Sequence, residues 1–410
     1  MRILMLTEFY PPIIGGIEQH VRTLSRALVA RGHQVAVATV WQEGLAEFEE
    51  DAGVRVYRVR GTLQRAKFLF TEKTRRHVPP LPDPELVAGI RQVQARERPH
   101  IVHAHNWMVH SFLPLKMTSG ARLVLTLHDY SLVCAKQRLW HNEAVCDGPG
   151  VKCLACSAAH YGAPRGIPTV VANWTMSIAE RKLVDMFLPV SQAVAHGTGL
   201  SDSSLPYQVI PNFVPDDVGV ISDGEKNAAQ LPDEYLLFVG DISVDKGVHV
   251  LLQAYENLSP TMPLVLIGRQ KIAWTRALPQ NVTIVPGLPH DAVMRAWRNS
   301  IIGLAPSIWS DPCPTVVMEA MAMGRPVIAS RIGGLTDLVA DGETGVLVPP
   351  GDVNALRAAM ARLISDADLR ARMGQAARAR VVAFQSQSVV PRIEQVYQRV
   401  LTPRAARSLQ

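Results

Sequence analysis

The sequence predicts an α/β protein made of two Rossmann-like, doubly wound domains that face each other across a cleft. Its 410 residues are more than one hydrophobic core usually holds. Hydrophobic residues make up 48% of the chain, enough for sheets that are buried on both faces. Short apolar runs alternate with helical patterns twice, once in each half of the chain. Together these observations favour two parallel sheets layered with helices.

The first series lies within residues 1–212, which we expect to form the N-terminal domain. Its apolar runs are rich in Val, Ile and Leu, as is typical of strands in a buried parallel sheet. The predicted strands are Ile3–Leu6, Val35–Val40, Val54–Val59, His100–Ala104 and Arg122–Leu127, and the predicted helices are Gly16–Arg31 and Glu85–Arg96.

The sequence changes character near Tyr207–Pro215, where several prolines and a polar stretch up to Gln230 indicate an interdomain linker. Residues 213–385 should form the C-terminal domain, and residues 386–402 have the pattern of an amphipathic helix that packs back on the first domain. The tail from Arg404 to Gln410 should be frayed. The strands predicted for this half are Tyr235–Val239, Leu264–Ile267, Val282–Val285, Ile301–Leu304 and Val327–Ala329.

The formal net charge of +6 resides in the first half of the chain. Residues 1–210 hold 23 Lys and Arg against 17 Asp and Glu, whereas residues 211–410 hold 19 of each. Much of the excess lies in one basic stretch, formed by Arg55, Arg58, Arg60, Arg65, Lys67, Lys73, Arg75 and Arg76. This stretch suits anionic lipid head groups or a phosphorylated acceptor, and it is equally well explained as a solvated surface loop. Nucleic acid is not an expected partner, because no recognition motif accompanies the charge.

The sequence also bears on cellular location. No apolar run approaches the roughly 20 residues that a membrane-spanning helix needs. The N-terminal segment Met1–Thr7 lacks the longer apolar core and the small-residue cleavage site of a signal peptide. We therefore expect a cytoplasmic protein, peripheral at the inner face of the membrane if the basic stretch binds lipid.

Two glycine pairs each precede a predicted helix. Gly15-Gly16 follows the first strand, and Gly333-Gly334 follows a strand of the second series. Adjacent glycines at the start of a helix expose backbone N–H groups to which an anion can come close. Alone, such a pair is more often a simple turn. Two pairs, one from each sheet, would face each other across the cleft.

A pair of carboxylates marks the second domain. Asp311 and Glu319 flank the segment Pro-Cys-Pro-Thr-Val-Val-Met, and a helix that begins near Pro314 would contain Glu319. The first-turn amides of Thr315 and Val316 would then be available to a phosphate. A carboxylate such as Glu319 suits the two hydroxyls of a ribose. From spacing alone, a helix cap at Asp311 and a surface charge at Glu319 explain the pattern equally well.

Four motifs in order carry a resemblance to a known family. They are Gly-Gly-x-Glu at 15–18, Phe-Val-Gly-x₅-Lys-Gly at 238–247, the acidic pair leading into Glu-Ala-Met-Ala-x-Gly, and Gly-Gly-Leu-Thr-Asp-Leu-Val-x-Asp-Gly-x-Thr-Gly at 333–345. Together the motifs resemble family 4 of the retaining glycosyltransferases, which have the GT-B fold. The resemblance covers nearly the whole chain. It implies that a sugar is transferred from a nucleotide diphosphate donor with retention of configuration and that catalysis requires no metal or other cofactor.

The resemblance also implies roles for individual residues. Lys246 would contact the donor diphosphate, and Gly240 would also belong to the donor site. Gly15-Gly16 would line the cleft opposite. Glu319 would bind the ribose, with the amides of Thr315 and Val316 near the phosphates. Asp311 stands where the family usually has a glutamate that contacts donor-sugar hydroxyls, so its reach is shorter by one methylene. His128, in Thr-Leu-His-Asp-Tyr, matches the family's active-site histidine, although a strand-end histidine can also be purely structural.

One departure from the family pattern concerns the diphosphate. The family usually has an arginine after the glycine at 240, and this chain has Asp241. A carboxylate would repel phosphate, so either its side chain points away or another cation substitutes. Arg269, at the end of the next strand, is the candidate.

Four of the five cysteines fall close together in sequence, at Cys134, Cys146, Cys153 and Cys156. Four thiolates can complete a tetrahedral structural zinc site, and Cys153-Leu-Ala-Cys156 has the usual spacing of a zinc knuckle. Free buried thiols or redox-sensitive cysteines explain the cluster equally well. If zinc binds, it should brace the long loop after His128.

The function most consistent with the sequence is transfer of a hexose-type unit from a nucleotide-diphosphate sugar to a carbohydrate or lipid-linked acceptor. A sugar-nucleotide epimerase or hydrolase is one alternative, because related folds host those reactions. A non-catalytic nucleotide-sugar-binding protein is another, motivated by Asp241 and Asp311. Base, sugar and acceptor are not specified by these motifs.

Overall fold

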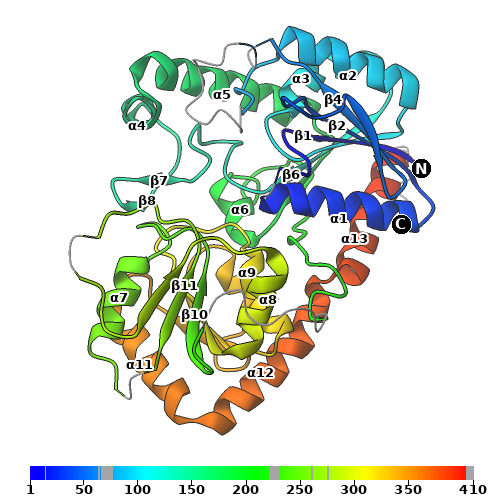
Figure 1. The fold of residues 1–410 in the computed structure, drawn as a ribbon. Coiled ribbons are helices and arrows are strands. Elements are labelled where there is room, and N and C mark those ends of the chain that lie inside the picture. The colour runs from blue at the N-terminus through cyan, green and yellow to red at the C-terminus, as the bar shows by residue number, and fades with distance from the viewer. Residues whose placement is uncertain are drawn as a thin grey trace.

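The computed structural model describes residues 1–13, 15–62, 65, 77–220, 231–259, 262–274 and 277–402. The chain forms two α/β bodies, one from each half, which are stacked with their facing edges close together (Figure 1). This is the architecture that the two series of apolar runs predict.

The first body is built on a seven-stranded sheet in the order β3-β4-β2-β1-β5-β6-β9, parallel except for β3. Its strands are β1 (Arg2–Thr7), β2 (Gln34–Val40), β3 (Phe48–Asp51), β4 (Val54–Val59), β5 (Ile101–Ala104), β6 (Arg122–Leu127) and β9 (Met186–Pro189). The helices of this half include α1 (Gly16–Ala30), α2 (Pro84–Glu97), α3 (Val109–Ser119), α5 (Ala163–Leu183) and α6 (Gln192–Gly197). Central β1 is buried along almost its whole length, as a parallel strand covered on both faces should be.

The second body has six parallel strands in the order β12-β11-β10-β13-β14-β15. They are β10 (Tyr235–Val239), β11 (Leu264–Ile267), β12 (Val282–Val285), β13 (Ser300–Ala305), β14 (Val327–Ser330) and β15 (Gly345–Val348). The helices are α7 (Val248–Glu256), α8 (His290–Asn299), α9 (Thr315–Ala322), α10 (Leu335–Leu338), α11 (Val353–Ser365) and α12 (Ala367–Val381). The strand order reverses at β10, and such a switch point opens a crevice at the carboxyl ends of the strands.

The chain crosses between the two bodies twice, and the two crossings lie side by side. The backbone N–H of Val214 donates to the carbonyl of Phe384 at 3.0 Å, and that of Ser386 donates to the carbonyl of Val214 at 3.0 Å. The second crossing leads into α13 (Ser386–Leu401), which runs back along the first body (Figure 1). Buried residues of α13 share a core with β1 residues, and the hydroxyl of Tyr397 lies 2.7 Å from Nδ1 of His103.

The structure changes the interpretation of the basic stretch. Each of its four described arginines forms an ion pair with a glutamate: Arg55 with Glu97, Arg58 with Glu49, Arg60 with Glu47 and Arg65 with Glu85. Their charge is therefore offset locally. Lys67, Lys73, Arg75 and Arg76 lie outside the described residues, as do the polar stretch 221–230 and the tail 404–410. Among the described helices, none is long and apolar enough to cross a membrane.

Candidate active site

A cavity of about 290 Å³ lies between the two bodies, at the carboxyl ends of their strands. Its lining comes from both halves of the chain, which places it at the crevice expected for ligands in doubly wound sheets. The lining residues are Gly16, Ile17, His128, Asn212, Val239, Gly240, Asp241, Lys246, Asp311, Cys313, Pro314, Thr315 and Val316.

The start of α9 forms one wall of this cavity. The N-cap is Pro314, whose side chain makes no capping hydrogen bond, and the first-turn amides at Thr315 and Val316 have no partner within the helix. The positive end of the helix dipole lies at the same place. This wall is therefore suited to an anionic group.

Among the described residues that line the cavity, Lys246 provides a cation, and Asp311 is its partner. The Lys246 ammonium contacts Oδ2 of Asp311 and lies 5.6 Å from the centre of the Trp309 ring. The Asp311 side chain is 9% exposed and that of Lys246 is 26% exposed, so the ammonium is the more accessible partner. A phosphate that enters the cavity must compete with Asp311 for Lys246.

The glycine pair Gly333-Gly334 supports the Asp311 loop from behind. The amide of Gly334 donates to the carbonyl of Asp311 at 2.7 Å. A Cβ at Gly334 would lie 1.9 Å from the carbonyl oxygen of Pro312, so the loop and this glycine are in close backbone contact. The first pair behaves differently, because Gly15 is the N-cap of α1 and Gly16 lines the cavity.

Asp241 lines the cavity, but its charge is engaged by two cations. Its carboxylate lies 2.7 Å from Nζ of Lys271 and 3.2 Å from Nε of Arg269. Burial raises the pKa of Asp241, but the two ion pairs outweigh it and hold this pKa below its ordinary value. Arg269 thus faces Asp241, and Lys271 is a second cation there that our sequence reasoning missed. The sequence signal for Lys271 was the run Arg-Gln-Lys at 269–271, one residue beyond the end of β11.

His128 is held by hydrogen bonds at both ring nitrogens. The Asn212 amide donates to the carbonyl of Cys313 at 3.0 Å, which directs its Oδ1 toward Nδ1 of His128, 3.0 Å away. Nδ1 therefore carries the proton, and Nε2 accepts from Nδ1 of His105 at 3.1 Å. A ligand that forms a hydrogen bond with the His128 ring must displace one of these partners.

Further histidines pack behind His128. The His20 ring lies 4.8 Å from the His128 ring between centroids, and His103 lies 4.2 Å from His105. Burial lowers the pKa of His128 to about 4 and that of His103 to about 3, and it also lowers the pKa values of His20 and His105. The four rings are therefore neutral near pH 7.

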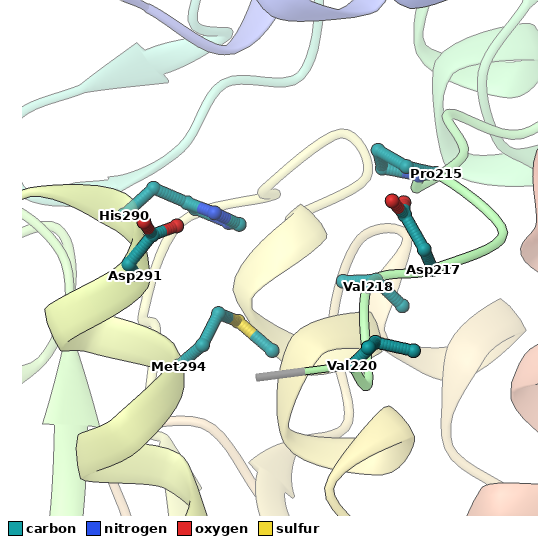
Figure 2. Close-up of a pocket in the computed structure, with 7 residues that line it drawn as sticks. All are labelled: Pro215, Asp217, Val218, Val220, His290, Asp291 and Met294. Carbon is teal, nitrogen blue, oxygen red and sulfur yellow. The ribbon is translucent and has the colours of Figure 1, made fainter. Parts of the chain in front are cut away.

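Glu319 lies on α9 one turn beyond Thr315, so both residues are on the same helix face. Its carboxylate is 10% exposed and lies 3.3 Å from Nε2 of His290, and this hydrogen bond raises the pKa of His290. His290 also lines a second cavity, of about 210 Å³, together with Pro215, Asp217, Val218, Val220, Asp291 and Met294. Figure 2 shows His290 and Met294 on α8 facing Val218 and Val220 across this pocket.

The structure therefore brings most of the expected site residues to one cavity. Gly16, Gly240, Lys246, Asp311, Thr315, Val316 and His128 all line it. Gly15 adjoins the lining at the start of α1, Glu319 lies one turn further along α9, and Arg269 reaches it through Asp241. Sequence reasoning missed Asn212, whose only signal was a polar residue between prolines, and also His290 with its second pocket.

The four clustered cysteines form a separate site, beyond β6. Cys134, Cys146, Cys153 and Cys156 line one small cavity, and none of them forms a disulfide. Burial raises the pKa of Cys153, and so do the other three thiols nearby.

Comparisons with known proteins agree with this architecture. The profile described as Glycosyltransferase Family 4 matches residues 14–218, and the one described as Glycosyl transferases group 1 matches residues 222–380. The chain is 28% identical to the glycogen synthase of Mycobacterium tuberculosis, over 97% of this chain and 94% of that protein.

Solved structures share the fold over the same extent. Sucrose-phosphate synthase from Thermosynechococcus elongatus has a TM-score of 0.74 and 21% identity, over 97% of this chain and 98% of that one. Anabaena HepE in complex with UDP-glucose has a TM-score of 0.65 and 17% identity, over 97% and 98% of the two chains.

Proposed function

The chain belongs to glycosyltransferase family 4 and is a glycosyltransferase with the GT-B fold, and from this premise we propose its donor, acceptor and stereochemistry. The donor is a nucleotide-diphosphate sugar, the acceptor is a carbohydrate or a lipid-linked saccharide, and the anomeric configuration is retained. The observation that carries the proposal is that Lys246 and the start of α9 lie on the wall of the same cavity.

The diphosphate of the donor is assigned to this wall. A leaving diphosphate gains negative charge as the glycosidic bond breaks, and preorganised cations and amides stabilise that charge. Lys246 supplies the cation, and Thr315 and Val316 supply first-turn amides. The Anabaena neighbour was solved with UDP-glucose, which supports a donor of this class.

The nucleoside end of the donor is assigned to Glu319 and the pocket beside it. Glu319 accepts hydrogen bonds from the two ribose hydroxyls, and the base occupies the pocket between α8 and residues 215–220. Met294, Val218 and Val220 offer apolar contacts to a flat ring there (Figure 2). These apolar contacts are the same for any base.

The sugar is assigned to the space near His128 and Asp311. In the transfer step the bond between the anomeric carbon and the diphosphate oxygen breaks, and the acceptor oxygen bonds to the same face of that carbon. The acceptor proton passes to the leaving diphosphate. Asp311 accepts from a donor-sugar hydroxyl, and His128 presents a neutral imidazole beside it.

A thermal-shift screen over UDP, GDP, ADP and their sugars tests the donor. A ligand that binds only the folded protein raises the unfolding midpoint by mass action, so the true donor should give the largest shift. The product of transfer is then examined by NMR, and its anomeric proton should report the donor's configuration. No shift with any nucleotide sugar would contradict the proposal. Donor turnover that needs no acceptor would indicate a hydrolase or epimerase instead.

A further inference from the structure

The four clustered cysteines come from three separate segments of the long loop after β6, residues 129–162, here called the cysteine loop. Cys134 follows a turn after His128, and Cys146 follows the hairpin of β7 (Trp140–His141) and β8 (Ala144–Val145). Cys153 and Cys156 lie in the first turns of α4 (Lys152–Tyr161). Folding brings all four thiols to the wall of one cavity of about 20 Å³.

The size and lining of this cavity suit a single ion. About 10–15 Å³ of such volume already holds one water-sized sphere. Besides the four thiols, the wall includes apolar Ala135, Trp140 and Val170, and Lys136, His141, Lys152 and Ser157 line it as well. Thiolates are soft ligands, which favour zinc over hard ions such as Mg²⁺ and Ca²⁺.

Two of the thiols are placed next to each other by the local structure of α4. Cys153 and Cys156 are three residues apart in the first turns of α4, so they lie on one helix face. The amide of Gly150 donates to Sγ of Cys153 at 3.4 Å, a contact that would orient this sulfur toward a bound ion.

Positively charged side chains lie beside the cavity and would partly balance a cluster of zinc and thiolates. Four thiolates and one Zn²⁺ carry a net charge of about −2. Lys136 and Lys152 both line the cavity, and Lys152 is shared with the carboxylate of Asp147. The two ammonium groups therefore offset part of that charge.

We propose that Cys134, Cys146, Cys153 and Cys156 bind one structural Zn²⁺ ion. The four thiols lose four protons to solvent, and the four sulfurs form a closed tetrahedral site with no open position for a substrate. Within the described residues, the ligand atoms that already lie within 4.8 Å of one another belong to a different set, His20, His105 and His128. The cysteine side chains must therefore rotate to close on the ion, and the histidine set is the rival location.

The ion would brace a loop that bridges the two bodies of the protein. Within the cysteine loop, Arg138 pairs with Asp245 at 3.0 Å and lies 5.4 Å from the centre of the Trp309 ring. The hydroxyl of Tyr130 hydrogen-bonds Ser310. Asp245 and Ser310 immediately precede Lys246 and Asp311 in the chain. A loop anchored by zinc thus touches the segments that carry the ion pair of the active site.

Metal analysis of the full-length protein tests the site. Protein made in zinc-supplemented medium and purified without chelator should hold one zinc per chain, and a mercurial that titrates four thiols should release it. The Cys153→Ser/Cys156→Ser variant should contain no zinc, whereas Cys313→Ser, which changes the cysteine outside the cluster, should keep it. Replacement by Co²⁺ should give a thiolate-to-cobalt charge-transfer band.

Three outcomes would overturn the proposal. One is wild-type protein without zinc whose four thiols react freely. Another is protein in which the cysteines are paired as disulfides. The third is zinc that persists in Cys153→Ser/Cys156→Ser but is lost in His20→Asn, which would place the metal at the histidine set. If the double cysteine variant fails to fold, the cobalt band and the mercurial titration of the wild-type protein still decide between thiolate and imidazole ligands.

Discussion

The ammonium of Lys246 and the carboxylate of Asp311 form an ion pair on the wall of the cavity between the two domains. The two groups are assigned to different parts of the donor, Lys246 to the diphosphate and Asp311 to the sugar. Changing each partner should therefore have opposite effects on nucleotide binding.

Lys246→Ala should weaken binding of the nucleoside diphosphate and lower turnover by about 100-fold, the usual loss when one preorganised charge at a reacting centre is removed. Asp311→Asn should bind the nucleoside diphosphate more tightly, because Lys246 no longer has a competing carboxylate, and should still lose turnover. Calorimetry with the diphosphate and steady-state kinetics measure the two effects. Lys182→Ala, which removes an exposed lysine on α5, is the matched control. Equal losses of diphosphate affinity in both site variants would contradict the assignment.

The two glycine pairs should respond differently to an added methyl group. Apart from its chain neighbours and its own helix backbone, a Cβ at Gly16 would meet none of the described atoms within 4 Å. Gly16→Ala should therefore fold normally, and it should lose substrate affinity if the ligand comes close to this glycine. Gly334→Ala should instead destabilise the fold by about 1–3 kcal/mol, because its Cβ collides with the Pro312 carbonyl. Urea unfolding and donor titration separate the two effects. A Gly16→Ala enzyme with unchanged substrate affinity would show that this loop does not touch the ligand.

Asp241 should be tolerated beside the diphosphate because Lys271 and Arg269 offset its charge. Removing both cations in Lys271→Ala/Arg269→Ala leaves an uncompensated carboxylate on the cavity wall, and donor affinity should fall by about tenfold or more. Adding Asp241→Asn to that variant should restore most of the affinity. Donor dissociation constants of the double and triple variants provide the comparison. A double variant with wild-type affinity would mean that Asp241 points away from the bound diphosphate.

The buried histidines predict a specific loss of stability in acid. His128, His103, His20 and His105 have folded-state pKa values below the ordinary 6.5, with His128 at about 4 and His103 at about 3. Between pH 6.5 and about 4 the unfolded chain therefore binds more protons than the folded protein. The free energy of unfolding should therefore fall as the pH drops through this window. Above pH 6.5 these four histidines should have little effect on it.

Urea unfolding at a series of pH values measures this slope. Each ring that stays neutral contributes up to about 1.4 kcal/mol per pH unit, so His20→Asn should flatten the slope by at most that amount. The pH profile of wild-type activity should also show no decrease near pH 6.5 that is caused by protonation of His128. Stability that stays constant between pH 7 and 5 would contradict the neutral cluster.

Much of the fold could be predicted because its central strands are apolar runs of four to seven residues. Such runs form buried parallel strands almost regardless of their neighbours. The edge strand β3 escaped prediction because its sequence, Phe-Glu-Glu-Asp, is polar and exposed, and only pairing with β4 makes it a strand. Strands β9 (Met-Phe-Leu-Pro) and β15 (Gly-Val-Leu-Val) also escaped prediction, because a proline ends one and a glycine begins the other, and both residues are depleted in strands.

The amino-acid pattern alone was sufficient for the two-domain α/β class, whereas most residues of the cavity were named through the resemblance to family 4. They come together because motifs at strand ends meet wherever parallel strands share an edge. Contacts between distant residues needed the folded chain. Three examples are the ion pair of Asp241 with Lys271, the hydrogen bond of Asn212 with His128, and the cavity that the four cysteines share. In each case the residues meet only because of the course that the loops take. Loops lack the periodicity that makes strands and helices predictable, so only their packed positions reveal which charges and thiols meet.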